Sequence, residues 1–160
     1  MQTLVVYYSL SGNTGSVATA LANELGASLE ELHCARYQMN PLGFIKAGFD
    51  SWANRLPHTG PLMHTPSVYD LVVVGAPMWA FRAATPVRAY LCQEAVRFRQ
   101  LAFFLTMGGA PPDKAFAEME ALAQQAPLAT LALSERDLKA GKLDSAAPAF
   151  AARLMARRAA

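Results

Sequence analysis

The sequence is poor in cysteine and has no long apolar run. Its two cysteines, Cys34 and Cys92, lack C-x-x-C spacing and are too few for a disulfide framework in 160 residues. We interpret both as reduced thiols. No apolar run approaches the roughly 18 residues that span a bilayer, and no basic segment precedes the first apolar run, which argues against a membrane anchor or a signal peptide. We therefore expect a cytoplasmic protein.

The sequence also lacks strong charge of either sign. Charged residues make up 16% of the chain, and the formal net charge is +2. The one basic cluster is Arg153, Arg157 and Arg158 near the C-terminus, which is too little to indicate a nucleic-acid partner. The three histidines have no metal-ligand spacing with one another or with Cys34, so no metal site is predicted.

Apolar residues are plentiful instead, at 53% of the chain, which is enough for one packed domain over residues 1–160. Short apolar runs alternate with segments of helical period and give five β–α pairs. The runs are 3–8, 27–32, 70–76, 101–107 and 128–133, and the clearest helical segments are 14–25, 85–92, 112–125 and 145–158. Runs that are apolar at consecutive positions are typical of parallel strands buried on both faces. The sequence thus predicts an α/β fold with a doubly wound five-stranded parallel sheet.

Two helix details follow from the residue types. Asn13 or Thr14 can cap the first helix with its side chain. In the last helix, we expect Phe150, Leu154 and Met155 to face the core.

The loop between the first strand and the first helix reads SLSGNT and carries no charge. In a parallel sheet, such a loop directs backbone N–H groups and the positive end of a helix dipole at a ligand above the strand, and an anion is the natural occupant. The hydroxyls of Ser9, Ser11 and Thr14 and the amide of Asn13 can bond a phosphate without any Lys or Arg. An ordinary capped turn is the alternative.

The loop matches none of the common polyphosphate motifs. A nucleoside triphosphate site needs a lysine that the loop lacks, and Gly12 and Gly15 are only a fragment of the dinucleotide-binding G-x-G-x-x-G. Neither a cysteine nucleophile nor the G-x-S-x-G elbow of hydrolases is present. A single terminal phosphomonoester fits best.

The N-terminal segment resembles the signature of the flavodoxin family. The matching residues are Val5, Val6, Tyr7, Ser9, Gly12, Thr14, Ala18 and Leu21. The resemblance implies a single three-layer domain with strand order 2-1-3-4-5, and an FMN cofactor whose phosphate is held by the loop from Ser9 to Thr14. Because no long insertion interrupts the chain after Leu128, it looks like a short-chain member.

Two further segments resemble flavin-side loops of short flavodoxin-like proteins, namely GAPMWAFRAATPVRAYL and FLTMGGAPPDKAFAEME. The resemblance implies cofactor contacts from Pro77, Met78, Trp79, Ala80, Phe81, Arg82, Met107, Gly108 and Gly109. Trp79 can cover a face of the flavin ring or serve as a hydrophobic plug. The paired glycines can admit backbone N–H groups close to the ring or merely form a turn.

The function implied by the resemblance is electron transfer or flavin-dependent oxidoreduction, since FMN supplies the chemistry and no acid–base pair or nucleophile stands out. Three hypotheses for the function stay open. They are a reductase linked to NAD(P)H or a quinone, a dedicated one-electron carrier with a redox partner protein, and a non-catalytic binding module. A guanidinium of Arg82 pointing at the ring would stabilise negative charge on the flavin and favour the reductase.

The stretch 41–57 departs from the minimal flavodoxin pattern. Its bulky apolar residues have the spacing of an amphipathic helix, and they are Phe44, Ile45, Phe49, Trp52 and Leu56. We expect this helix to be the second crossover helix, packed on the sheet. A lid near the flavin or a homodimer contact is the alternative.

Overall fold

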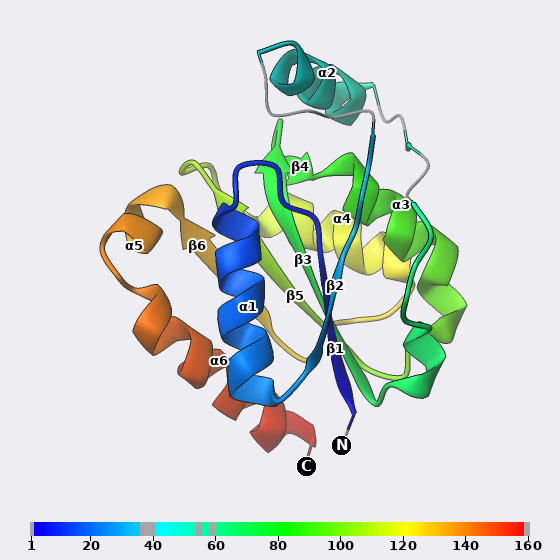
Figure 1. The fold of residues 1–160 in the computed structure, drawn as a ribbon, viewed down its shortest axis with the longest axis vertical. Helices are drawn as coiled ribbons and strands as arrows, with labels where there is room; N and C mark the ends of the chain where they lie inside the picture. The colour runs from blue at the N-terminus through cyan, green and yellow to red at the C-terminus, as the bar shows by residue number, and fades with distance from the viewer. Residues whose placement is uncertain (1, 36–40, 54–55, 58–59, 159–160) are drawn as a thin grey trace.

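The computed structural model describes residues 2–35, 41–53, 56–57 and 60–158, and Figure 1 shows their arrangement. The strands are β1 (Thr3–Tyr7), β2 (Ser28–Glu31), β3 (Leu71–Trp79), β4 (Arg82–Ala83), β5 (Leu101–Met107) and β6 (Thr130–Ser134). The α-helices are α1 (Asn13–Leu25), α2 (Pro41–Trp52), α3 (Thr85–Glu94), α4 (Asp113–Ala123), α5 (Glu135–Lys139) and α6 (Leu143–Arg158). Short 3₁₀ turns cover Pro66–Val68 and Ala95–Arg97.

The sheet has the order β2-β1-β3-β5-β6, and these five strands are parallel. This confirms the expected doubly wound order, to which the structure adds β4, a two-residue strand antiparallel to β3. The winding direction reverses between β1 and β3. In open parallel sheets, ligands bind outside the carboxyl ends of the strands at such a switch point.

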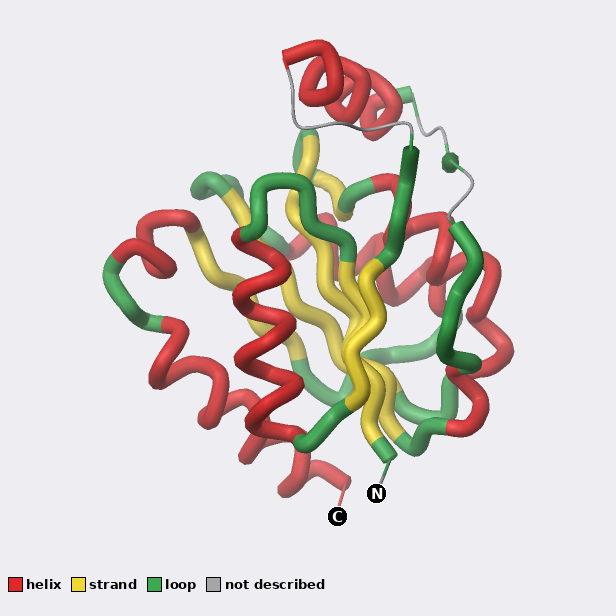
Figure 2. Tube along the Cα trace, viewed as in Figure 1, coloured by secondary structure: helices red, strands yellow, loops and turns green. Residues whose placement is uncertain are grey.

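Helices cover both faces of the sheet, with α1 and α6 on one side and α3 and α4 on the other (Figures 1 and 2). Successive strand residues point to opposite layers, so Leu4 and Val6 pack with α3 and α4 while Val5 packs with α1 and α6. Gly75 on β3 gives Phe104 its room, because a Cβ at Gly75 would lie 1.9 Å from the phenyl ring. None of the described helices is long and apolar enough to cross a membrane.

Two expected helix details prove wrong. The N-cap of α1 is Gly12, and neither Asn13 nor Thr14 caps the helix with its side chain. A left-handed Gly12 turns the chain straight from the loop into the helix, so the cap position falls one residue earlier than expected. In α6, Phe150 and Leu154 are fully buried as predicted, but Met155 is 50% exposed, since the buried stripe continues through alanines instead.

The prediction of a helix within 41–57 is confirmed by α2, but its expected packing on the sheet is wrong. The helix lies beyond the carboxyl ends of the strands (Figure 1). Leu42 and Ile45 are each 68% exposed and Phe49 is 51% exposed. Hydrophobic periodicity identifies which residues share a helix face, but it does not identify what that face contacts. The side chains of Phe44 and Trp52 lie outside the described residues.

A segment with one 3₁₀ turn and no α-helix leads back to β3 along the flank of the sheet where a crossover helix was expected. Glu30 on β2 holds this segment, because its carboxylate accepts hydrogen bonds from the backbone N–H groups of Met63, at 3.1 Å, and His64, at 2.8 Å. Leu62 and Tyr69 then pack against the core on that side.

Candidate functional site

The loop between β1 and α1 folds around the hydroxyl group of Ser9. The Ser9 Oγ accepts hydrogen bonds from the backbone N–H groups of Gly12, at 3.1 Å, and Gly15, at 3.2 Å. Gly12 has a φ of 94°, in the left-handed region that glycine adopts without a Cβ penalty. Ser9 therefore shapes the loop and satisfies one N–H group of the first helical turn.

The first turn of α1 keeps two further backbone donors for a ligand. The N–H groups of Asn13 and Thr14 have no acceptor within the described residues, and α1 has no side-chain cap. The exposed Ser11 lies just before them. Together with the positive end of the helix dipole, these donors favour an anion at this helix start without the help of Lys or Arg.

The hydroxyl of Thr14 does not point to solvent but meets the hydroxyl of Thr106 on β5. The two oxygens lie 2.7 Å apart, and the residues are 1% and 4% exposed. Each hydroxyl has one proton and the pair uses only one of them, so the second proton remains for another acceptor. Thr106 lines the cavity described next, and it thus links the start of α1 to the end of β5 and to that cavity.

A cavity of 180 Å³ lies between the start of α1, the ends of β3 and β5, and the start of α5. The predicted site residues that line it are Ser11, Asn13, Pro77, Met78, Trp79, Met107 and Gly108. The structure thus brings together the three segments that the sequence singled out. This convergence occurs because all three follow neighbouring parallel strands.

Trp79 forms one wall of this cavity and is only partly buried. Its ring meets the ring of Tyr8 edge-on, with the centroids 5.5 Å apart and the planes at 88°. This arrangement is favourable for two aromatic rings, and it fixes the orientation of the indole.

Other predicted residues lie around this cavity. Ser9 and Gly12 border a second hollow, of 400 Å³, on the other side of the loop. Tyr7 and Glu31 border the same hollow, and burial, followed by the charge and hydrogen bond of Glu31, raises the pKa of Tyr7 above its ordinary value of 10. Gly109, with a φ of 153°, forms the bend after the cavity residue Gly108.

Sequence reasoning missed three residues of the 180 Å³ cavity, namely Leu10, Thr106 and Glu135. Thr106 lies inside an apolar strand run, where no local signal marks it. Glu135 directly follows β6. Because ligands bind at the carboxyl ends of parallel strands, its position after a predicted strand was a signal that could have identified it.

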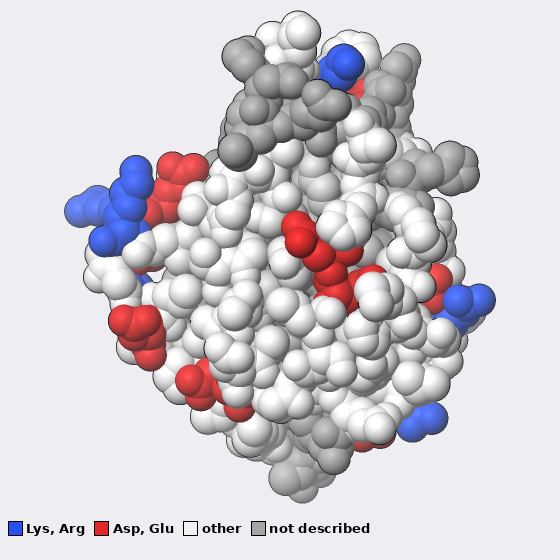
Figure 3. Space-filling view, in the orientation of Figure 1, with Lys and Arg blue, Asp and Glu red and all other residues white. Residues whose placement is uncertain are grey.

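Among its described residues, the face of the molecule that Figure 3 shows carries no basic patch over the loop between β1 and α1. In Figure 3, most of the described surface of this face is uncharged, and acidic side chains gather over β2, which carries Glu30 and Glu31. The Lys and Arg side chains, drawn in blue, lie mainly at the rim of this view. An anion at the start of α1 is therefore favoured by backbone and hydroxyl donors rather than by a basic patch.

The segment 77–82, which resembles a flavin-side loop in the sequence, forms a tight hairpin. Strand β3 continues through Trp79, and the pairs Trp79↔Arg82 and Met78↔Ala83 leave a two-residue turn at Ala80 and Phe81. Both turn residues have positive φ, 48° and 64°, which is the pattern of a type I′ turn. Phe81 is 60% exposed at the tip.

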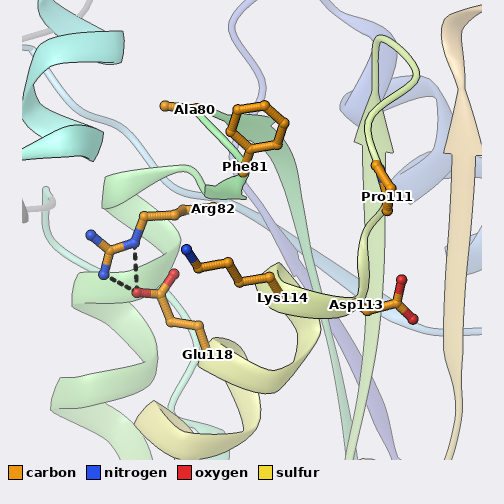
Figure 4. Close-up of a pocket in the computed structure, with 7 residues that line it drawn as sticks. All are labelled: Ala80, Phe81, Arg82, Pro111, Asp113, Lys114 and Glu118. Atoms are coloured by element: carbon orange, nitrogen blue, oxygen red, sulfur yellow. Dashed lines mark hydrogen bonds and ion pairs between the residues drawn. The ribbon is translucent and has the colours of Figure 1, made fainter.

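The guanidinium group of Arg82 points to α4. Its Nε donates to the Glu118 Oε1 at 2.9 Å, and its Nη2 bonds the same oxygen (Figure 4). The Nε of the buried Arg88 lies 3.4 Å from that oxygen as well. The carboxylate thus lies between two guanidinium groups, and the positive charge of Arg82 is compensated.

The hairpin tip separates the 180 Å³ cavity from a larger one, of 740 Å³, on the side of α4. The predicted residues Ala80, Phe81 and Arg82 line this larger cavity together with Pro111, Asp113, Lys114 and Glu118 (Figure 4). The predicted site residues are therefore divided among the 180 Å³ cavity, the 400 Å³ hollow and the 740 Å³ cavity, and Thr14 and Gly109 line none of the three.

A parallel sheet of this strand order, with its switch point between β1 and β3, is the arrangement of the flavodoxin class. The flavodoxin family model matches residues 2–143, and the chain belongs to that family. No curated protein sequence matches the chain significantly.

Solved structures share the fold. A flavoprotein from Lactobacillus acidophilus, crystallised in complex with FMN, has a TM-score of 0.71 at 23% identity, over 89% of this chain and 98% of its own. A WrbA-like flavodoxin from Agrobacterium tumefaciens has a TM-score of 0.65 at 18% identity, over 98% and 97%. Oxidised flavodoxin 1 from Bacillus cereus reaches 0.58 at 14% identity, over 97% of each chain.

Proposed function

We propose that this chain binds FMN at the 180 Å³ cavity and works as an electron-transfer flavoprotein. The observation that carries the proposal is the start of α1, whose free backbone donors open beside three neighbouring strand ends. The FMN phosphate takes the N–H groups of Asn13 and Thr14, the hydroxyl of Ser11 and the amide of Asn13. Ser9 and Gly12 hold the loop in shape for this contact, and Thr106 orients the hydroxyl of Thr14.

The flavin ring fits the remaining walls. Pro77, Met78, Trp79 and Met107 supply apolar and aromatic surface, and Gly108 lets the backbone approach closely. A cavity of 180 Å³ is smaller than the roughly 300–1,000 Å³ of most cofactor sites. We therefore propose that the ring extends past the cavity mouth along the hairpin and Gly109.

FMN supplies one- and two-electron chemistry when bound. The residues of this chain bind and orient it, and they shield part of it from water. Because Arg82 is paired with Glu118, it does not offer the free positive charge at the ring that would favour a reductase. A reductase linked to NAD(P)H or a quinone is supported instead by the adjacent 740 Å³ cavity, which has room for a small-molecule substrate.

A flavin titration tests the proposal. We expect FMN to bind one to one and riboflavin to bind roughly 10- to 150-fold more weakly, because riboflavin lacks the phosphate and its charge-assisted hydrogen bonds. The quenching of flavin fluorescence measures both. A Trp79→Ala control should weaken the two flavins by the same factor, since the indole contacts only the ring. Equal affinities of the wild type for both flavins, or no binding of either, would contradict the proposal.

A further inference from the structure

The 740 Å³ cavity between the β3–β4 turn and α4 has no part in the phosphate site. Its walls are the apolar groups of Ala80, Phe81 and Pro111, and its floor is the ion pair of Arg82 and Glu118 (Figure 4). The turn holds Phe81 in a defined place, since the flanking residues are paired as strands. The phenyl ring, 60% exposed, thus offers a flat apolar surface to a ligand.

The charges of this cavity favour an anion. Glu118 lies between the guanidinium groups of Arg82 and Arg88, so its charge is already compensated. In Figure 4, the side chain of Lys114 extends into the cavity while the carboxylate of Asp113 points away from it. Lys114 has no carboxylate partner within the described residues. Its ammonium group, which in Figure 4 points toward Arg82 and Glu118 on the floor of the cavity, therefore makes no ion pair within the described residues.

The geometry points to a binding site for a planar aromatic molecule that carries one anionic group, seated against Phe81 with its anion on Lys114. Resting on the proposed function, we assign this ligand class to the small-molecule substrate of the flavoprotein. The hairpin that carries Trp79 toward the 180 Å³ cavity carries Phe81 toward this one. A ligand here thus lies directly across the hairpin from the proposed flavin cavity.

A matched pair of redox-inert probes tests the site without relying on turnover. The probes are 2-naphthalenesulfonate and the neutral 2-naphthalenesulfonamide, titrated calorimetrically into FMN-saturated and FMN-free protein. We expect the sulfonate to bind both the FMN-saturated and the FMN-free protein. In each case it should bind more tightly than the sulfonamide. Lys114→Gln should weaken the sulfonate about three- to fivefold, as for an exposed ion pair, and leave the sulfonamide unchanged. Phe81→Ala should weaken both probes, by about two- to tenfold.

Lys139→Gln on α5 is the matched control, because it removes the same charge from an exposed position outside this cavity. It should leave both probes unchanged. The proposal would be overturned if the wild type and Lys114→Gln bound the sulfonate with equal affinity. It would also be overturned if FMN abolished the binding of the sulfonate, because the probe would then occupy the flavin cavity. Lys114-dependent binding to a protein that does not take FMN would support this site while contradicting the proposed function.

Discussion

The starts of α1 and α4 occupy similar places in the fold but handle charge in opposite ways. Each helix follows a parallel strand, and neither has a side-chain cap. At α1, the loop supplies hydroxyls and free N–H groups, and Glu135 lines the adjoining cavity, whereas the α4 cavity is lined by Arg82, Asp113, Lys114 and Glu118. The α1 site keeps its donors for a ligand. The α4 site pairs Arg82 with Glu118, and its proposed selectivity depends on Lys114.

The largest effect should come from breaking the internal pairing at α4. Glu118→Gln removes the negative charge that faces Arg82 and the almost fully buried Arg88. We expect the free energy of unfolding to fall by about 2–3 kcal/mol, somewhat less than for a fully buried pair, because Glu118 and Arg82 keep 17% and 26% exposure. Urea denaturation measures the change.

Glu120→Gln serves as the control, since Glu120 is exposed on the same helix. It should change stability by less than about 0.5 kcal/mol. If the two variants were equally stable, the Arg82–Glu118–Arg88 cluster would contribute nothing measurable to the free energy of unfolding. The two helix starts would then not differ in how much their charges stabilise the fold.

A smaller effect is expected at α1, where the contact is a single hydrogen bond. Thr106→Val keeps the shape of the side chain but leaves the buried Thr14 hydroxyl without its partner. We expect stability to fall by about 1–2 kcal/mol and FMN affinity to fall more than riboflavin affinity. Thr106→Ser keeps the hydroxyl and should retain the preference for FMN. A Thr106→Val protein with an unchanged ratio of the two affinities would show that this contact is structural only.

The smallest effect at neutral pH should come from Tyr90 on α3, in the layer shared with α4. Its hydroxyl is buried and has no hydrogen-bond partner among the described residues. Burial, followed by the charges of Glu94 and Glu30, raises its pKa well above the ordinary value of 10. The unfolded chain therefore loses this proton near pH 10 while the folded chain keeps it, so stability falls as the pH rises above 10.

Tyr90→Phe removes that titration. We expect its stability near pH 8 to stay within about 0.5 kcal/mol of the wild type, because the hydroxyl makes no bond to lose. Between pH 10 and 11, its decline should be shallower by up to about 1.4 kcal/mol per pH unit. Urea denaturation across this range gives both slopes, and identical slopes would mean that the phenol also ionises in the folded protein.

The sequence was sufficient for the parts of the fold that depend on local pattern. Runs such as 101–107 are apolar at every position and become strands buried on both faces, as predicted. The loop after β1 could be located because glycine and hydroxyl residues mark a turn before a helical period. The convergence of three loops followed from the parallel topology alone, and the structure brings Ser11, Trp79 and Gly108 to one cavity.

Other features depend on contacts between residues far apart in the chain, which local pattern does not contain. The Thr14–Thr106 bond joins residues 92 positions apart, and Arg82 pairs with a glutamate 36 positions later. The direction of Arg82 could therefore not be read from its place beside Trp79. The position of α2 likewise depends on which surface receives its apolar face, and periodicity leaves that open.

The Ala80–Phe81 turn has a consequence for engineering. Residues with a Cβ adopt this conformation at roughly 1–2 kcal/mol each, whereas Asn-Gly adopts it readily. A consensus or thermostabilising design would therefore select Asn-Gly here and obtain a more stable protein. The same change would delete the aromatic wall of the larger cavity. At this turn, resistance to heat and recognition of a ligand are competing demands on two residues, and the natural chain retains the less stable choice.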